Sequence, residues 1–125
     1  MIVPLLLAVA VAAPPRAVPD CLGTPQVKPA AVVLACADAN FGLRKLRWSG
    51  WGKATARATG VAYANDCTPN CAAGHMHSYR AVLVASGRQV CHGEQVYARV
   101  RVSFPGKSPY PKATKADLTY PRRCG

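Results

Sequence analysis

Four side chains with the chemistry of zinc ligands lie close together in the middle of the chain. Cys67, Cys71, His75 and His77 form the pattern C-x3-C-x3-H-x-H. Structural zinc sites usually hold two separated ligand pairs, with tighter spacing inside the cysteine pair, and cysteines of exported proteins tend to be oxidised. We therefore expect two surface histidines beside a disulfide-bearing loop, with no metal and no cofactor.

A second pattern could carry acid–base chemistry on RNA. Glu94 is the only glutamate, His92 lies two residues before it, and Arg99 and Arg101 follow. A glutamate base, a histidine acid and phosphate-binding arginines would suit a small basic nuclease. In a regular strand, however, His92 and Glu94 face away from both arginines, unless a bulge at Gly93 re-aims them. We therefore name no catalytic residue and keep a ribonuclease-like hydrolase as an alternative.

Positive charge offers a third kind of chemistry, the binding of anions. Sixteen Lys and Arg face five Asp and Glu, which gives a formal net charge of +11. Such a field attracts polyanions, although it also serves solubility. Some of the cations lie near Trp48 and Trp51, and this mixture suits single-stranded nucleic acid or glycan, but we expect Trp48 to belong to the core. The candidate binding residues are Arg44, Lys45, Arg47, Lys53, Arg57, Arg99 and Arg101.

Six cysteines are expected to form three disulfides that staple the fold. They are Cys21, Cys36, Cys67, Cys71, Cys91 and Cys124. Six cysteines allow fifteen pairings, among which sequence cannot choose. We favour Cys21 with Cys124, because this bridge would tether the two proline-rich ends across the core. Cys67 and Cys71 either close a small loop around Pro69 or each reach a neighbouring strand, and the remaining pairing stays open.

The chain opens with an apolar run from Ile2 to Ala13, broken only by Pro4. A bilayer span needs about 20 apolar residues, so this run fits the core of a secretory signal, although it lacks the usual initial Lys or Arg. Ala10 and Ala12 have the spacing that signal peptidases prefer, which predicts a signal peptide over residues 1–12. No later stretch predicts a transmembrane segment. We expect a soluble, secreted, extracellular protein, in agreement with its cysteines.

After the leader, the composition divides the chain into three parts. Residues 13–29 form a proline-rich arm, residues 30–104 a β domain, and residues 105–125 a Pro/Lys-rich tail. Composition alone would leave the tail disordered, but Cys124 holds it to the domain. The expected architecture is therefore one domain with two arms.

Period-two alternation marks the strands of the domain. Lys53–Tyr63 has a face of small residues, over which Trp48 or Trp51 is expected to pack. Glu94–Phe104 points its valines inward and Tyr97 outward. Further strands are expected at Ala30–Ala37, Leu43–Trp48 and Ser78–Ala85. The pattern predicts an all-β fold, a small disulfide-stapled sandwich or barrel of five to six strands.

Three segments carry a family resemblance. They are Leu34–Asp38 (LACAD), Leu46–Gly52 (LRWSGWG) and Asn65–Gly74 (NDCTPNCAAG). With their W-x-x-W-G and C-x-P-x-C-A motifs, they resemble a family of small secreted actinobacterial proteins. The likeness covers about Val32–Phe104 and leaves out both arms. It implies export and one folded unit, and it transfers no activity.

These observations together predict a secreted, non-catalytic binding protein with a basic surface. Its expected partner is an anionic polymer, such as nucleic acid or a cell-wall polymer, or an anionic membrane surface. The alternatives are the ribonuclease-like hydrolase and a protease inhibitor that presents the loop from Cys67 to Gly74. The sequence does not define an oligomeric state.

Overall fold

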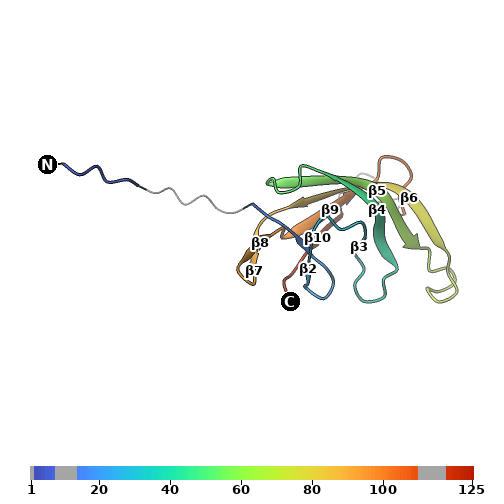
Figure 1. Ribbon diagram of the computed structural model, residues 1–125. Helices are drawn as coiled ribbons and strands as arrows, with labels where there is room; N and C mark the ends of the chain where they lie inside the picture. The colour runs from blue at the N-terminus through green and yellow to red at the C-terminus, as the bar shows by residue number, and fades with distance from the viewer. Residues whose placement is uncertain (1, 8–13, 110–117) are drawn as a thin grey trace.

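The computed structural model describes residues 2–7, 14–109 and 118–125 of the chain. A curled six-stranded antiparallel sheet dominates it, with the strand order β10-β9-β6-β5-β4-β3 (Figure 1). Its strands are β3 (Val32–Val33), β4 (Phe41–Ser49), β5 (Thr55–Asn65), β6 (Met76–Ser86), β9 (Arg99–Ser103) and β10 (Leu118–Pro121). Two small antiparallel pairs accompany it, β1 (Val18–Pro19) with β2 (Pro25–Gln26) and β7 (Gln89–Cys91) with β8 (Glu94–Val96).

The predicted all-β, disulfide-stapled class is confirmed, in the form of one curled sheet. The expected strand over Ala30–Ala37 is shorter than its apolar run, since only Val32 and Val33 pair with β4. No helix long and apolar enough to span a bilayer occurs in the described ranges.

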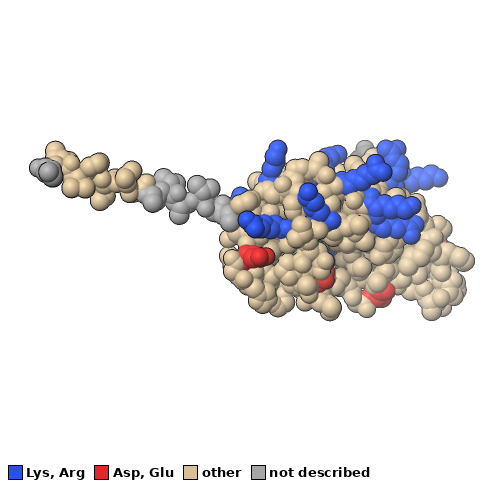
Figure 2. Space-filling view, in the orientation of Figure 1, with Lys and Arg blue, Asp and Glu red and all other residues tan. Residues whose placement is uncertain are grey.

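The two faces of the sheet differ in polarity, and the alternation along strand β5 shows this difference. Its alternate alanines, Ala56, Ala58, Ala62 and Ala64, are buried on the inner face, as the alternation in the sequence predicted. Leu43 and Leu83 from the neighbouring strands belong to the same core, and both tryptophans pack against it. The outer face is polar and cationic. Figure 2 shows Lys and Arg gathered along one side of the molecule and Asp and Glu along the other.

Tyr97 lies where the sequence pattern did not place it. The single strand expected over Glu94–Phe104 is interrupted by Tyr97 and Ala98, which separate β8 from β9. The Tyr97 side chain is fully buried instead of pointing outward. Its hydroxyl donates to the Lys53 carbonyl at 2.7 Å and accepts from the Gly52 amide at 3.0 Å. A buried phenol needs such partners, so this strand break is coupled to the turn between β4 and β5.

A bulge in β4 decides which of its cations share a face. The register with β5 shifts between Arg44 and Arg47, and Lys45 has a φ of 56°. Without the bulge, alternation would send Arg44 and Arg47 to opposite faces, because they are three residues apart. With it, both are exposed while Leu46 is buried between them. Gly60 of β5 lies against the bulge, where a Cβ atom would stand 2.8 Å from the Arg44 carbonyl oxygen.

The proline-rich arm and the end of the tail both contribute to the core of the domain. In the described part of the proline-rich arm, Ala17 and Val18 are buried, and the Ala17 carbonyl accepts from the Tyr97 amide. In the tail, β10 pairs with β9 as an edge strand, and Arg122 after it is buried. The end of the tail is therefore ordered into the sheet, in contrast to what its composition suggested.

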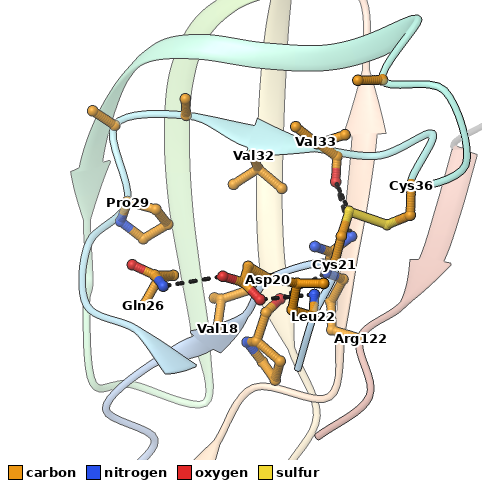
Figure 3. Close-up of a pocket in the computed structure, with 14 residues that line it drawn as sticks. Val18, Asp20, Cys21, Leu22, Gln26, Pro29, Val32, Val33, Cys36 and Arg122 are labelled. Carbon is orange, nitrogen blue, oxygen red and sulfur yellow. Dashed lines mark hydrogen bonds between the residues drawn. A yellow bond between two sulfur atoms is a disulfide. The ribbon is translucent and has the colours of Figure 1, made fainter. Parts of the chain in front are cut away.

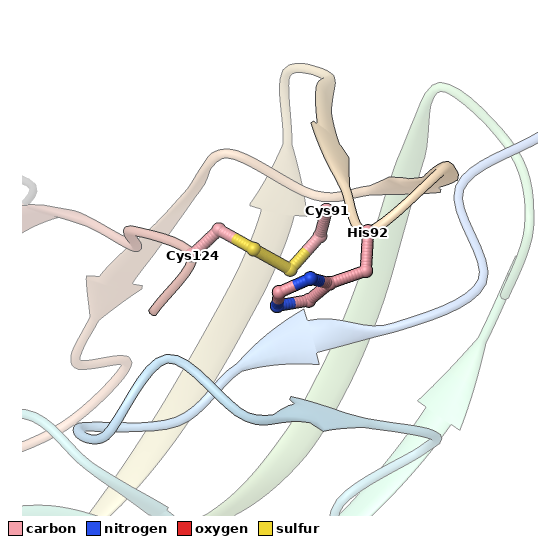
Figure 4. Close-up of side chains that lie close together, drawn as sticks. All are labelled: Cys91, His92 and Cys124. Atoms are coloured by element: carbon pink, nitrogen blue, oxygen red, sulfur yellow. A yellow bond between two sulfur atoms is a disulfide. The ribbon is translucent and has the colours of Figure 1, made fainter.

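The disulfides join Cys21 to Cys36 (Figure 3), Cys91 to Cys124 (Figure 4), and Cys67 to Cys71. The predicted Cys21–Cys124 bridge is therefore wrong. The proline-rich arm and the end of the tail do meet, but through a backbone hydrogen bond of 3.2 Å from Gly125 to Gly23. Cys124 follows edge strand β10, and its partner lies in the β7–β8 hairpin that leads toward β9. The small loop of Cys67 and Cys71, one of two alternatives left open, is confirmed.

We expect Gly60→Ala to destabilise the protein by about 1–3 kcal/mol, because the added methyl group meets backbone atoms that cannot move without shifting the bulge. Urea unfolding of the oxidised protein measures this. The control is Gly106→Ala, whose Cβ would have no atom within 4 Å. This control should leave stability unchanged or raise it by up to about 1 kcal/mol. Equal stability of both variants would show that the bulge does not constrain Gly60.

Candidate functional site

The outer face of the sheet gathers arginines from four strands. We call this surface the arginine face, and its members are Arg44 and Arg47 of β4, Arg57 of β5, Arg80 of β6, and Arg99 and Arg101 of β9, all exposed. None of the six strands of the sheet contains Asp or Glu. The fold thus gathers the arginines of these four strands on one face, and Figure 2 shows Lys and Arg concentrated along one side of the molecule.

Strand register sets the spacing on the arginine face. Arg57 stands opposite Val84 of β6, which in turn stands opposite Arg101 of β9. Neighbouring strands are about 4.8 Å apart, so the Cα atoms of the two arginines are separated by about 10 Å. Arg44 and Arg80 are related in the same way through Val61. Arginines therefore recur across the sheet with a valine between them.

One valine of this face, Val82, is covered although it points outward. Val82 is only 7% exposed. Its neighbours on the face include Arg80 along β6, and Arg57 and Arg101 at diagonal positions on the adjacent strands. Arginine stems cover apolar surface while their charged heads stay in water. Arginine side chains therefore surround a buried Val82, while Val61 and Val84 stay partly exposed on the same face.

Arg44 and Tyr63 shape one end of the arginine face. The Arg44 guanidinium reaches across β5 and donates to the Ser78 hydroxyl at 3.1 Å. The Tyr63 ring lies over Gly42, where a Cβ atom would come too close to the ring to be accommodated. Tyr63 thus supplies an aromatic ring on this side of the sheet.

Five of the seven predicted binding residues share the arginine face: Arg44, Arg47, Arg57, Arg99 and Arg101. Lys45 lies in the bulge and Lys53 in the turn after β4. The tryptophans do not join them, because Trp48 is half-buried on the inner side and its Nε1 donates to the Pro29 carbonyl at 2.8 Å. Sequence analysis missed Arg80, although its position between Ser78 and Val82 carried the period-two signal.

The four side chains of the predicted zinc pattern do not form a zinc site in this structure. The sulfur atoms of Cys67 and Cys71 are bonded to each other, and His77 Nε2 pairs with Asp66 Oδ2 at 2.9 Å. A different trio, Cys91, His92 and Cys124, has its ligand atoms within 4.8 Å of one another (Figure 4). Its two sulfur atoms also form a disulfide, so they offer no thiolates in this state.

The residues of the ribonuclease alternative lie on different elements. His92 and Gly93 form the two-residue turn of the β7–β8 hairpin, both with positive φ, as type I′ turns require. Glu94 follows at the exposed start of β8, whereas Arg99 and Arg101 belong to the arginine face of the six-stranded sheet. The hairpin is a separate two-stranded sheet. The ribonuclease alternative therefore gains no support from the arrangement of these residues.

Asp66 organises the loop between β5 and β6. Its Oδ1 atom accepts from the backbone amides of His75 at 2.9 Å and Thr68 at 3.1 Å, while Oδ2 pairs with His77. These bonds, led by that from the His75 amide, hold the pKa of the Asp66 carboxyl well below its usual value. The loop that the inhibitor alternative invokes is thus fixed at both ends, and that alternative stays a prediction.

Comparisons of the chain with protein-family models, with curated proteins and with solved structures gave no match. The resemblance in the tryptophan and cysteine motifs therefore stays a prediction, and any function has to be argued from the described geometry.

We expect Asp66→Asn to lower the melting temperature at neutral pH, because the substitution removes the charged acceptor of the loop. The pKa of Asp66 is lower in the folded than in the unfolded chain, so its stabilisation is fully present above the unfolded value of about 3.9 and is lost as pH falls below it. The gap between variant and wild type should therefore narrow from about pH 4 toward about pH 2 in thermal melts.

Glu94→Gln is the matched control, since it also removes one carboxylate, from the exposed start of β8. Its melting temperature should stay close to that of the wild type at neutral pH. A gap for Asp66→Asn that stays constant down to about pH 2 would contradict a role for the ionised carboxylate.

Proposed function

We propose that this protein is an exported, non-catalytic binding protein whose arginine face holds an anionic polymer. The observation that carries the proposal is the collection of six arginines from four strands on a face whose strands contain no acidic residue. Arginine presents a planar fork of donors that matches phosphate and carboxylate groups. An extended face with arginines about 10 Å apart suits a chain with repeated negative charges better than one small anion.

An anionic polymer fits this face better than a membrane surface does. Membrane-binding surfaces usually insert apolar side chains beside their cations. On the strands of the arginine face, Met76 at the start of β6 is the only large hydrophobic residue that the described structure exposes. The outward Val82 is buried, and Val61 and Val84 are only partly exposed. Among the described residues, these strands therefore offer charge with Met76 as their one exposed large hydrophobic side chain.

Export is the second part of the proposal. It rests on the apolar leader and on the three disulfides, which persist in oxidising compartments. An extracellular location would also bring a basic face into contact with cell-wall polymers or released nucleic acid.

Binding should be measured by fluorescence anisotropy with labelled polyuridylate and, in parallel, with polyphosphate. We expect affinity to fall steeply with salt and to be lost near about 1 M. The double variant Arg47→Gln with Arg57→Gln should weaken binding by about tenfold and reduce the salt slope by about 1.4, the amount expected for two lost phosphate contacts. Intact RNA after incubation would separate binding from the ribonuclease alternative.

The control is Lys28→Gln with Arg123→Gln, which removes the same charge from exposed positions outside the sheet. This double variant should keep nearly the wild-type affinity. An equal loss of affinity in both double variants would contradict a defined binding face and would show that the net charge alone drives binding. Preference for anionic vesicles over both polymers would favour the membrane alternative.

We expect the full chain, produced in a secreting bacterial host, to appear outside the cells with Ala13 as its first residue. Edman sequencing of the secreted product identifies that residue, and thiol titration without reductant should detect no free cysteine. Retention of the uncleaved chain in the cytoplasm, with reduced thiols, would contradict export.

A further inference from the structure

A cavity of about 590 Å³ opens on the side of the sheet away from the arginine face (Figure 3). The N-terminal segment with β1 lies along one side of it and β3 along another, and the Cys21–Cys36 disulfide closes an edge. Its volume falls within the range of about 300–1,000 Å³ typical of small-molecule sites. The lining is mainly aliphatic, with Val18, Leu22, Pro29, Ala31, Val32 and Val33.

One buried charge marks the polar end of this cavity. Arg122 is 5% exposed and is the only buried charged side chain among the described residues. Its Nε–H donates to the Pro19 carbonyl at 2.9 Å, and Nη1–H donates to the Val33 carbonyl at 3.1 Å. A guanidinium has five N–H groups. Two backbone carbonyls thus hold part of the guanidinium in place, and Arg122 lines the cavity.

Asp20, whose charge acts on this guanidinium, does not neutralise it by contact. Asp20 Oδ1 accepts from the amides of Leu22 and Thr24, both at 2.9 Å, and Oδ2 accepts from Gln26 Nε2 at 3.1 Å. Asp20 and Arg122 form no ion pair within the described part of the chain. A buried charge is costly unless it is paired. Burial accordingly lowers the pKa of Arg122, and the Asp20 charge only opposes that effect.

We propose that this cavity binds a small aliphatic monocarboxylate, with the carboxylate on Arg122 and the hydrocarbon chain along β3 and the N-terminal segment. A single negative charge is favoured because Asp20 lies at the same end and would repel a second one. A hydrocarbon chain is favoured because the described residues that line the cavity include no aromatic side chain. Leu22 lines the cavity and is 85% exposed, which places an apolar side chain where a ligand enters. This site is separate from the arginine face.

Titration calorimetry of the full, oxidised chain with decanoate tests this proposal, with decanol and propionate as comparison ligands. Decanoate should bind at least tenfold more tightly than decanol, which lacks the charge, and than propionate, which lacks the chain. Trp48 gives a second signal, because its Nε1 donates to the carbonyl of the lining residue Pro29. Equal binding of decanoate and decanol would overturn the role of Arg122.

Arg122→Gln removes the charge directly, but Arg122 also supports the fold, so a second variant is needed. Ala31→Trp places a large side chain in the cavity from an exposed position and should abolish decanoate binding. Val90→Trp is the control, since Val90 is exposed on β7 and does not line the cavity. All variants carry the same leader, so any binding of decanoate to the leader is the same in each and does not affect the comparison between them. Wild-type affinity in Ala31→Trp, or loss of decanoate binding in the Arg47→Gln, Arg57→Gln variant, would overturn the proposal.

Discussion

The inner face of one curled sheet has to be kept from water, and the rest of the molecule follows from this constraint. Strand β5 can lie in the middle of the sheet because its inward residues are small, from Ala56 to Ala64. Larger side chains then fill the space above them. Tyr97, Trp51 and Trp48 form an edge-to-face series there, with ring centroids 5.4 Å and 4.8 Å apart. The aromatic rings thus belong to the core and not to a binding surface.

A single sheet of this size cannot cover its own inner face, and the proline-rich arm and the end of the tail add to the core. The proline-rich segment supplies Val18 to the core, and β10 supplies Leu118 and Tyr120. Disulfides hold these ends, with loops of 15 residues for Cys21–Cys36 and 33 for Cys91–Cys124. In the chain-entropy model these two cross-links contribute about 3 and about 3.7 kcal/mol. Local tethering at each end therefore replaces the single long bridge that sequence analysis favoured.

Charge is distributed by the same geometry. Residues that alternate with the buried alanines have to point outward, so Arg57 and its counterparts on β4, β6 and β9 share the outer face. Arg122 is the exception, because it follows the edge strand and turns beneath it to reach two backbone carbonyls. The molecule thus has many solvated cations on one side and one desolvated cation on the other. Such environments suit different ligands, because exposed charges are screened by salt and buried ones are not.

Periodicity and residue type in the sequence determined the all-β class, the small-residue face of β5, the excess of positive charge and the presence of a disulfide framework. These features depend on residue composition and on the relation between residues two positions apart, both of which are present in the sequence itself. Tertiary structure alone decided the cysteine pairing, the bulge that aligns Arg44 with Arg47, the burial of Tyr97 and the place of Arg122. The reason is physical: each of these depends on which strands become neighbours and in which register. That choice is made by the packing of the whole chain and not by any local stretch of it.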